Sequence, residues 1–158
     1  MPDTSNAKIP TVKPSFAASR EGGADLSTTW LGHGTCLVEF PPGFRAIFDP
    51  VFEERCTPIG RKRFTPAACS ASDIPELDAV FISHNHHDHL SIPSVKELAG
   101  LFPHLHFFVG RGLAKWFRDS GIISVTEMGW WEDAEVVLQK RTGPKAKGGG
   151  GRGSRRCA

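Results

Sequence analysis

The stretch Ser83-His84-Asn85-His86-His87-Asp88-His89-Leu90 decides the fold that this sequence predicts. Four histidines and one aspartate stand within it, directly after the apolar run Ala79-Val80-Phe81-Ile82. A short run of β-branched and aromatic residues ahead of a polar cluster is typical of a buried strand that ends in a loop. Open α/β sheets place their ligands at this carboxyl end of the strands. Because zinc and neighbouring transition metals prefer imidazole nitrogens and carboxylate oxygens, the loop is predicted to bind metal.

The spacing within the loop divides its donors into two pairs. His84 and His86 can turn toward one ion while Asp88 and His89 turn toward a second. The alternative is a solvated histidine run or a purification tag. A tag would be terminal, would contain no aspartate and would not follow an apolar strand, so the metal site is favoured.

The loop also carries a resemblance to a known family. His84-x-His86-x-Asp88-His89 is similar to the HxHxDH signature of the metallo-β-lactamase-fold hydrolases. Its flanks resemble the branch that contains N-acylphosphatidylethanolamine-hydrolysing phospholipase D, and more distantly the ascorbate-6-phosphate lactonases. The similarity covers about residues 28–135. The segments that carry it are, in chain order, Thr29-Trp30-Leu31-Gly32-His33-Gly34-Thr35, Phe48-Asp49-Pro50-Val51-Phe52, Ile82-Ser83-His84-Asn85-His86, Trp116-Phe117 and Gly129-Trp130-Trp131.

This resemblance implies a fold and an activity. The fold is α/β (α+β), a metallo-β-lactamase-like αββα sandwich. The activity is that of a zinc-dependent phosphodiesterase acting on N-acylphosphatidylethanolamine, so a phospholipid substrate and transient membrane contact are expected. A complete site holds two Zn²⁺ ions, the first on the counterparts of His84 and His86 and the second on those of Asp88 and His89. Asp88 is also expected to be catalytic, because it would orient the attacking water.

Other activities within the superfamily stay open at this point. Ribonuclease Z resembles the same HxHxDH loop, and a lactonase-like hydrolase is a further alternative. The flanking residues Trp30 and Asp49 and the Trp130-Trp131 pair favour the phospholipase branch. Nucleic acid is therefore not expected as a partner.

The second half of the resembled domain supplies further ligands. In the family each metal takes at least one more histidine, and a carboxylate bridges the two ions. No histidine occurs after His106, and Val136-Val137-Leu138 runs into a Gly/Arg-rich segment. A catalytic zinc site usually takes three protein ligands, whereas each predicted ion has two. We therefore expect the chain to be truncated, to correspond to the N-terminal half of the fold and to have doubtful activity. A non-catalytic, partial metal-binding protein is the alternative.

Two residues outside the loop are candidates for supporting it. His33 lies in a predicted hairpin turn and is interpreted as a structural turn residue, with a place in the metal pocket as the alternative. Asp49 ends a predicted strand before a proline. It is predicted to accept a hydrogen bond from a ligand imidazole, although Asp-Pro is also a common turn opener.

A basic loop follows at residues 53–75. Arg61, Lys62 and Arg63 form its basic run, which would suit a substrate phosphate because arginine binds phosphate in a bidentate manner. A solvated charge run is the equally open alternative.

The chain of 158 residues has the length of one domain. We predict a flexible leader over residues 1–26, a partial metallo-β-lactamase-like domain over 27–139 and a disordered basic tail over 140–158. The tail holds seven Lys/Arg and no acids, so residues 1–139 hold twelve basic and seventeen acidic residues. The body is therefore mildly acidic, and the basic character belongs to the tail.

The sequence also predicts where the protein works. It shows no apolar stretch as long as a membrane span and no secretory signal. The four cysteines are irregularly spaced and are interpreted as free thiols, none of them a strong nucleophile. We expect an intracellular protein, cytoplasmic or peripheral at a membrane. The oligomeric state is not predicted.

The expected elements alternate after an antiparallel opening. Strands are predicted over residues 28–31, 36–40, 45–48, 79–82, 105–109 and 122–126, and helices over 93–98 and 113–118. His104 and His106 are expected at an edge or in the core rather than as ligands. Trp116, Trp130 and Trp131 are expected in the core, with pocket lining as the alternative.

Overall fold

The computed structural model describes residues 10–16, 25–41, 43–56, 59 and 62–137. Its strands are β1 (Ser27–Gly32), β2 (Thr35–Phe40), β3 (Phe44–Phe48), β4 (Ala79–Phe81), β5 (His106–Gly110) and β6 (Val125–Met128). Its helices are α1 (Ile92–Leu101) and α2 (Ala114–Asp119), and a short 3₁₀ helix, η1, spans Ala71–Asp73.

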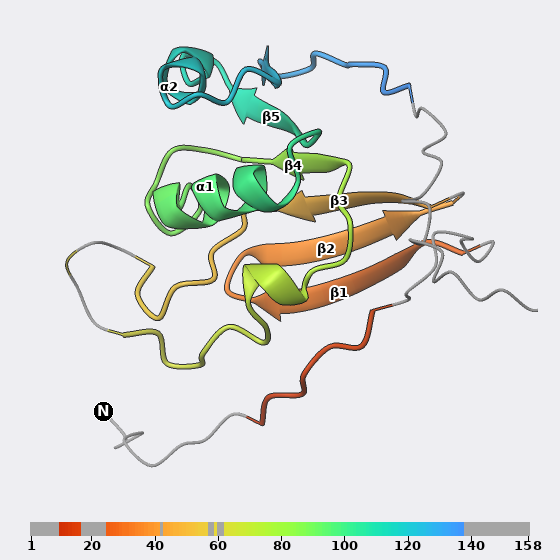
Figure 1. The fold of residues 1–158 in the computed structure, drawn as a ribbon, viewed down its shortest axis with the longest axis vertical. Helices are drawn as coiled ribbons and strands as arrows, with labels where there is room; N and C mark the ends of the chain where they lie inside the picture. Colours follow the sequence, from red (N-terminus) through yellow and green to blue (C-terminus); the bar gives the residue numbers. More distant parts are fainter. Residues whose placement is uncertain (1–9, 17–24, 42, 57–58, 60–61, 138–158) are drawn as a thin grey trace, which may run out of the picture.

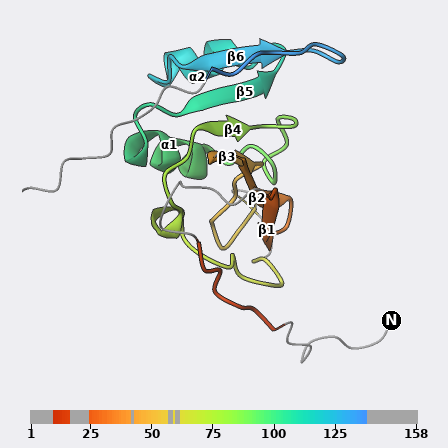
Figure 2. The ribbon, with the colours of Figure 1, turned by 90° about the vertical axis from the view of Figure 1, so that its right-hand side faces the viewer.

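The described strands form one six-stranded sheet in the order β1-β2-β3-β4-β5-β6. The pairs β1–β2 and β2–β3 are antiparallel, whereas β3–β4, β4–β5 and β5–β6 are parallel. Helix α1 follows β4 and α2 follows β5, and both helices lie on the same side of the sheet (Figure 1, Figure 2). Because the last four strands run parallel, the loops that follow β3, β4, β5 and β6 all leave from the carboxyl ends of these strands, on one side of the sheet. The predicted metal loop is one of these.

The core lies between the sheet and the two helices. Ile47, Val80 and Phe107 point into it from β3, β4 and β5, since alternate residues of a strand face the same side. Leu98 from α1 and Phe117 from α2 pack against this face, and all five side chains are buried. This packing fixes the strands whose ends carry the predicted site.

The opposite face of the sheet is also apolar. Phe48, Phe81 and Phe108 stack across β3, β4 and β5, with ring centroids 4.9 and 4.8 Å apart. Ala46 and Ala79 are buried beside them. Strands that are apolar on both faces are expected in the central layers of a sandwich, where each face meets another layer.

Helix α1 begins directly after the metal loop, and its start is well capped. Ser91 is the N-cap, and its hydroxyl oxygen accepts a hydrogen bond from the Ser94 N–H at 3.3 Å. Both hydroxyls donate to the Glu53 carboxylate, Ser91 Oγ at 2.7 Å and Ser94 Oγ at 2.9 Å. Glu53 therefore ties the segment after β3 to the helix that follows β4.

The predicted α/β class is confirmed: the structure has one mixed sheet with an antiparallel opening and helices on its face. One predicted strand was placed wrongly. Residues 122–124 precede β6 instead of forming it, because the Ile122 N–H donates to the Phe117 carbonyl at 2.9 Å and closes helix α2. Ile123 is 83% exposed as a result.

Part of the predicted leader lies against the domain. Within the described residues 10–16, Lys13 Nζ donates to Asp73 Oδ1 at 2.8 Å, and Phe16 packs against the core cluster.

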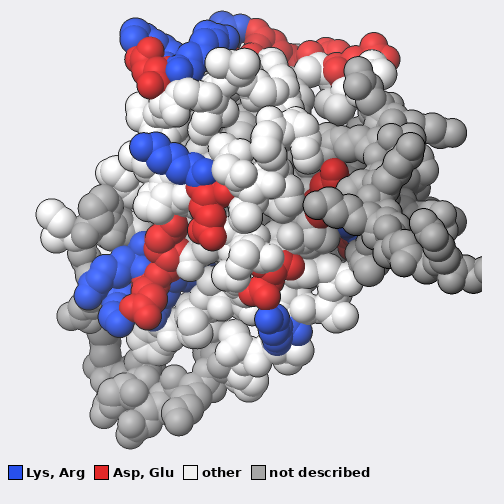
Figure 3. All heavy atoms as spheres, viewed as in Figure 1, with Lys and Arg blue, Asp and Glu red and all other residues white. Residues whose placement is uncertain are grey.

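The face that carries the helices shows acidic and basic side chains close together (Figure 3). The predicted tail lies outside the described residues. Among the helices that the structure describes, none is long and apolar enough to cross a bilayer.

His106, at the start of β5, gives the fold a dependence on pH. Its Nδ1 faces Ser124 Oγ and its Nε2 faces Thr126 Oγ1, each at 2.9 Å. Burial lowers the pKa of His106 below its usual 6.5, because a buried imidazolium loses hydration. A histidine whose pKa is lower in the folded chain than in the unfolded chain makes its full contribution to the free energy of unfolding at pH values above the unfolded pKa. That contribution is lost as the pH falls below 6.5 toward the folded pKa.

We therefore expect the free energy of unfolding to fall on acidification from about pH 7.5 to about pH 5.5, and to fall less in His106→Gln. Glutamine cannot take up the proton but keeps a polar side chain between the two hydroxyls. Urea unfolding of both proteins at both pH values measures the difference. Equal falls in the two proteins would show that other groups are responsible.

Candidate metal centre

The predicted metal loop leaves the sheet at the end of β4. The Ile82 N–H donates to the Phe108 carbonyl at 2.9 Å, which extends the pairing with β5 by one residue. The N–H groups of His89 and Leu90 then donate to the His86 carbonyl at 2.9 and 2.7 Å. This tight turn folds the loop back on itself, so the rings of His84 and His89 lie 4.2 Å apart between centroids.

Asp49, which follows β3, holds this loop through its carboxylate. Oδ1 accepts from the Ser83 N–H at 2.7 Å. Oδ2 accepts from Ser83 Oγ at 2.7 Å and from His89 Nδ1 at 2.9 Å. The backbone of Asp49 has φ 43°, a left-handed conformation that aspartate adopts more readily than most residues. A buried carboxylate with three donors therefore connects the neighbouring β3 and β4 ends.

These bonds assign the tautomers of two histidines. His89 donates from Nδ1 to a carboxylate, so its Nε2 keeps a free lone pair. Ser83 gives its one hydroxyl hydrogen to Asp49, so the contact of 2.9 Å between Ser83 Oγ and His84 Nδ1 is donated by His84. The Nε2 of His84 therefore also keeps its lone pair. Ligand histidines commonly use the second ring nitrogen in this way.

His84 and His86 present nitrogens at a distance that suits one ion. His84 Nε2 and His86 Nδ1 lie 3.1 Å apart. Two nitrogens on a tetrahedral zinc, at about 2.0–2.1 Å from the metal, are separated by roughly 3.3 Å. The two nitrogens also lie within hydrogen-bond distance of each other. The pair fits the predicted first metal position, with two donors from the described residues.

His33 brings a third donor to Asp88 and His89. It lies in the turn between β1 and β2, where its φ of 51° and the Trp30 Nε1 donation to its carbonyl at 2.9 Å turn the ring toward the loop. His33 Nε2 is 3.2 Å and His89 Nε2 is 3.7 Å from Asp88 Oδ2, and the three ligand atoms lie within 4.8 Å of one another. The side chains are half-exposed, so an ion and a substrate could reach them.

The same contacts keep Asp88 ionised. Partial burial alone would raise the pKa of Asp88, but its own backbone hydrogen bond, the electrostatic attraction of His89 and the hydrogen bond with His33 outweigh this and lower the pKa below the usual value. An ionised carboxylate is the form that binds a cation. In contrast, burial raises the pKa of the Cys36 and Cys69 thiols, which disfavours the thiolate and agrees with the prediction that neither is a nucleophile.

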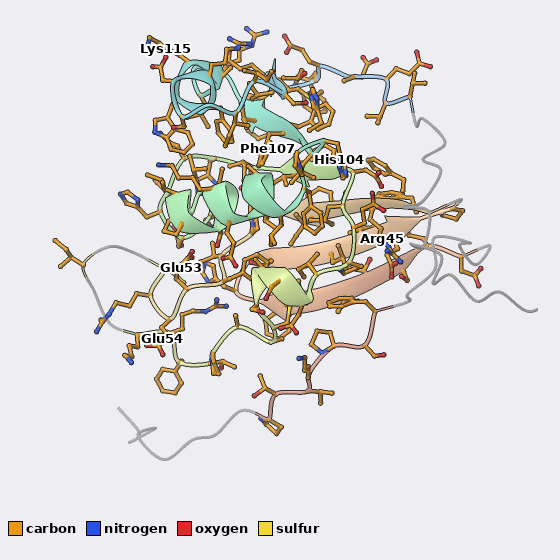
Figure 4. The ribbon with its side chains drawn as sticks, in the orientation of Figure 1. Arg45, Glu53, Glu54, His104, Phe107 and Lys115 are labelled. Carbon is orange, nitrogen blue, oxygen red and sulfur yellow. The ribbon has the colours of Figure 1, made fainter. Side chains whose placement is uncertain are left out.

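The predicted phosphate-binding loop is engaged in other contacts where the structure describes it. Lys62 Nζ lies 2.5 Å from Glu54 Oε2, in an exposed pair. Arg63 donates to the Val51 carbonyl at 2.8 Å and packs so closely on Gly32 that a side chain there would meet its guanidinium. Arg61 lies outside the described residues. Glu53 lies beside α1 and Glu54 further out along the loop (Figure 4).

The three tryptophans predicted in the core differ in their placement. The core placement of Trp130 and Trp131 was wrong: they are 91% and 98% exposed, and they line a pocket, which was the alternative. Trp116 packs against the core cluster as expected. His87 lines a separate pocket of about 440 Å³ beside the start of α1.

Ser83 is a residue that sequence reasoning missed. It links Asp49 to His84 through its hydroxyl and contributes its N–H to the same carboxylate. Its position next to the first histidine was visible in the sequence. Nothing in the sequence, however, placed Asp49 opposite it, because that contact spans 34 residues.

Comparison with known proteins places the chain among its relatives. The family model described as the beta-lactamase superfamily domain matches residues 45–156. An N-acyl-phosphatidylethanolamine-hydrolyzing phospholipase D 1 from Caenorhabditis elegans is 38% identical over 125 residues, 74% of this chain and 35% of that protein. The mitochondrial N-acyl-phosphatidylethanolamine-hydrolyzing phospholipase D of Saccharomyces cerevisiae is 30% identical over 126 residues, 78% of this chain and 26% of that protein. A UPF0173 metal-dependent hydrolase from Solibacter usitatus is 30% identical over 96 residues, 57% of this chain and 37% of that protein.

The chain thus spans between 26% and 37% of the length of these curated relatives. The family match begins at β3, includes the whole HxHxDH loop and covers most of the chain. It also extends into the range predicted to be a tail. The resemblance inferred from the motifs is confirmed, and the chain belongs to the metallo-β-lactamase superfamily.

Proposed function

We propose that this chain provides the metal-binding half of a zinc-dependent phosphodiesterase that acts on N-acylphosphatidylethanolamine or a closely similar phospholipid. The observation that supports this best is the convergence of His33, Asp88 and His89, whose ligand atoms lie within 4.8 Å of one another. The relatives named for N-acyl-phosphatidylethanolamine hydrolysis support the substrate class. Membrane contact would then be transient and would follow from the substrate.

The residues fit a cation by chemistry as well as by distance. Two imidazole nitrogens and one carboxylate oxygen form a donor set typical of zinc. Asp88 is ionised, and the tautomer of His89 leaves Nε2 free to bind. His84 and His86 offer a second position with the same kind of nitrogen donors. We propose Zn²⁺ at both positions, the first on His84 and His86 and the second on His33, Asp88 and His89.

The chain's own residues then have distinct roles. A divalent ion bound there would polarise a phosphoryl oxygen and lower the pKa of water at the site. Asp88 would accept a hydrogen bond from the attacking water and orient it toward phosphorus. Asp49 and Ser83 would hold His89 and His84 in the orientation and tautomer needed for binding. This arrangement favours hydrolysis of a phosphodiester over chemistry that needs a nucleophilic side chain.

Metal content and turnover of the purified 158-residue chain test the proposal. We expect about two Zn²⁺ per chain and hydrolysis of N-acylphosphatidylethanolamine in mixed micelles. EDTA treatment should remove both ions and the hydrolysis, whereas His86→Ala should remove the hydrolysis and the ion proposed at His84 and His86. His104→Ala is the matched control, because His104 is a similarly exposed histidine that bonds the Leu77 carbonyl away from the loop. Two bound ions with no turnover would refute hydrolysis by this chain.

Non-catalytic metal binding is the second candidate function. It is favoured by the pair His84–His86, which has two donors where catalytic zinc usually takes three protein ligands. Among the described residues, His33, Asp88 and His89 form the one group of three potential ligands. This candidate predicts a chain that binds one ion and loses it readily to EDTA. Such a chain would hydrolyse neither phospholipid nor a simple phosphodiester.

A further inference from the structure

A pocket of about 710 Å³ opens directly beside the metal loop. Ser83 and His84 form one wall, and Met128, Trp130 and Trp131 form much of the other. Its volume lies within the range typical of sites for small molecules. The pocket therefore begins at a proposed metal ligand and extends away from the loop along apolar side chains.

The turn that presents the two tryptophans is clamped. Gly129 N–H donates to Glu132 Oε2 at 2.6 Å, and the Arg111 guanidinium donates to the other oxygen of the same carboxylate. Gly129 packs on Arg111 so closely that a Cβ would clash with its Nε at 2.6 Å. Trp131 sits at φ 65°, a left-handed conformation that is unfavourable for a bulky residue. Strain that is held in place by a specific clamp beside a site is a sign of function.

The charges and hydrogen-bond donors around the pocket indicate which kind of ligand it favours. Arg111 is the cation in its wall, and its pairing with Glu132 neutralises that charge. The nitrogens of His84 are directed at Ser83 and His86. What remains facing the pocket is two almost fully exposed indoles and a thioether, which favour apolar ligands. A neutral chain fits this wall better than a second phosphate.

We propose that this pocket binds an acyl chain of the lipid, with the polar end of the chain at His84 and its methylenes along Trp130 and Trp131. The proposal rests on the proposed function for the identity of the ligand as part of a phospholipid. Binding of the chain itself needs no metal. The clamp of Arg111 and Glu132 acts as a positioning element, since it holds the turn that forms the apolar wall.

Binding of N-acylethanolamines to the metal-free full chain tests this assignment. A series from N-hexanoyl- to N-dodecanoylethanolamine, kept below the micelle concentration, is titrated in EDTA and followed by tryptophan emission and by calorimetry. We expect Kd to fall by about two- to fourfold for each methylene that becomes buried. The double variant Trp130→Ala/Trp131→Ala should raise Kd for the longest ligand at least about tenfold and remove the dependence on length. Glu132→Gln should give a smaller loss, because it loosens the clamp.

Phe64→Ala is the matched control, as Phe64 is an exposed aromatic residue outside the pocket. It should bind like the unmodified chain. A Kd that does not change with chain length, or binding that is insensitive to the double variant, would overturn the proposal. Tighter binding of phosphocholine than of N-decanoylethanolamine would also overturn it and would indicate a cation site on the indoles. Length-dependent binding in a chain that hydrolyses no phosphodiester would uphold the pocket and refute the proposed activity.

Discussion

Asp49→Asn should lower the affinity of the chain for Zn²⁺ by about 10- to 100-fold, as loss of a carboxylate behind a ligand histidine typically does. The carboxylate accepts from Ser83 N–H, Ser83 Oγ and His89 Nδ1. An amide in its place offers one acceptor oxygen and one donor nitrogen, so at least one of these donors faces another donor. The tautomers of His84 and His89 are then no longer fixed, and both proposed metal positions are weakened together.

The same substitution should cost about 1–3 kcal/mol of folding stability, because it leaves a buried donor without a partner. Asparagine tolerates the left-handed backbone at this position, so the cost is one of hydrogen bonding. Asp49→Ala should add roughly 1–2 kcal/mol, since alanine is strained at positive φ. Calorimetric Zn²⁺ titration and urea unfolding measure the two effects separately.

Asp78→Asn provides a matched control for Asp49→Asn. Asp78 accepts a hydrogen bond from the Arg45 N–H at 2.8 Å. This contact lies where β3 and β4 begin, whereas the metal loop follows the end of β4. The Asp78→Asn variant should lose stability and keep its metal affinity. If both variants lost metal affinity in proportion to their stability, Asp49 would be a structural residue with no particular role in orienting ligands.

The parts of this structure that could be predicted are those written locally in the sequence. The run Ala79-Val80-Phe81-Ile82 predicted a buried strand, and the strand β4 with its extension to Ile82 is where the structure places it. The HxHxDH spacing predicted the loop, and its tight turn brings His84, His86 and His89 together. A short apolar run and the spacing of the residues after it are enough for such features, because they depend on neighbours in the chain.

Apart from the hydrogen bond between Asp49 and a loop histidine, features that depend on distant contacts escaped prediction. His33 was interpreted as a structural turn residue, with a place in the pocket left open, and its contact with Asp88 spans 55 residues. The exposure of Trp130 and Trp131 depends on the clamp from Arg111, which local hydrophobicity does not reveal. The start of β6 was missed because the end of α2 takes the Ile122 N–H first. A tertiary hydrogen bond decided the first two outcomes, and a local hydrogen bond at the end of α2 decided the third.

His33→Asn should selectively remove the ion proposed at Asp88 and His89. Asparagine keeps the left-handed backbone at φ 51° but is too short to place a donor where His33 Nε2 lies, 3.2 Å from Asp88 Oδ2. Two donors remain in place of three, so the affinity of this position for Zn²⁺ should fall at least about 100-fold, beyond the loss typical of a supporting residue. The pair His84–His86 should keep its ion, because the ring of His33 is no part of it.

Zinc titration against a competing chelator separates the two positions, since a loss at one of them lowers the number of tight sites from about two to about one. His104→Ala, with a side chain of similar exposure away from the loop, should keep both. An unchanged stoichiometry in His33→Asn would return His33 to the role of a turn residue and leave the second position with Asp88 and His89. A loss of both ions would mean that the two positions bind cooperatively. The selective loss is expected because Asp49 connects the two positions through Ser83 and His89, whereas His33 contacts the second alone.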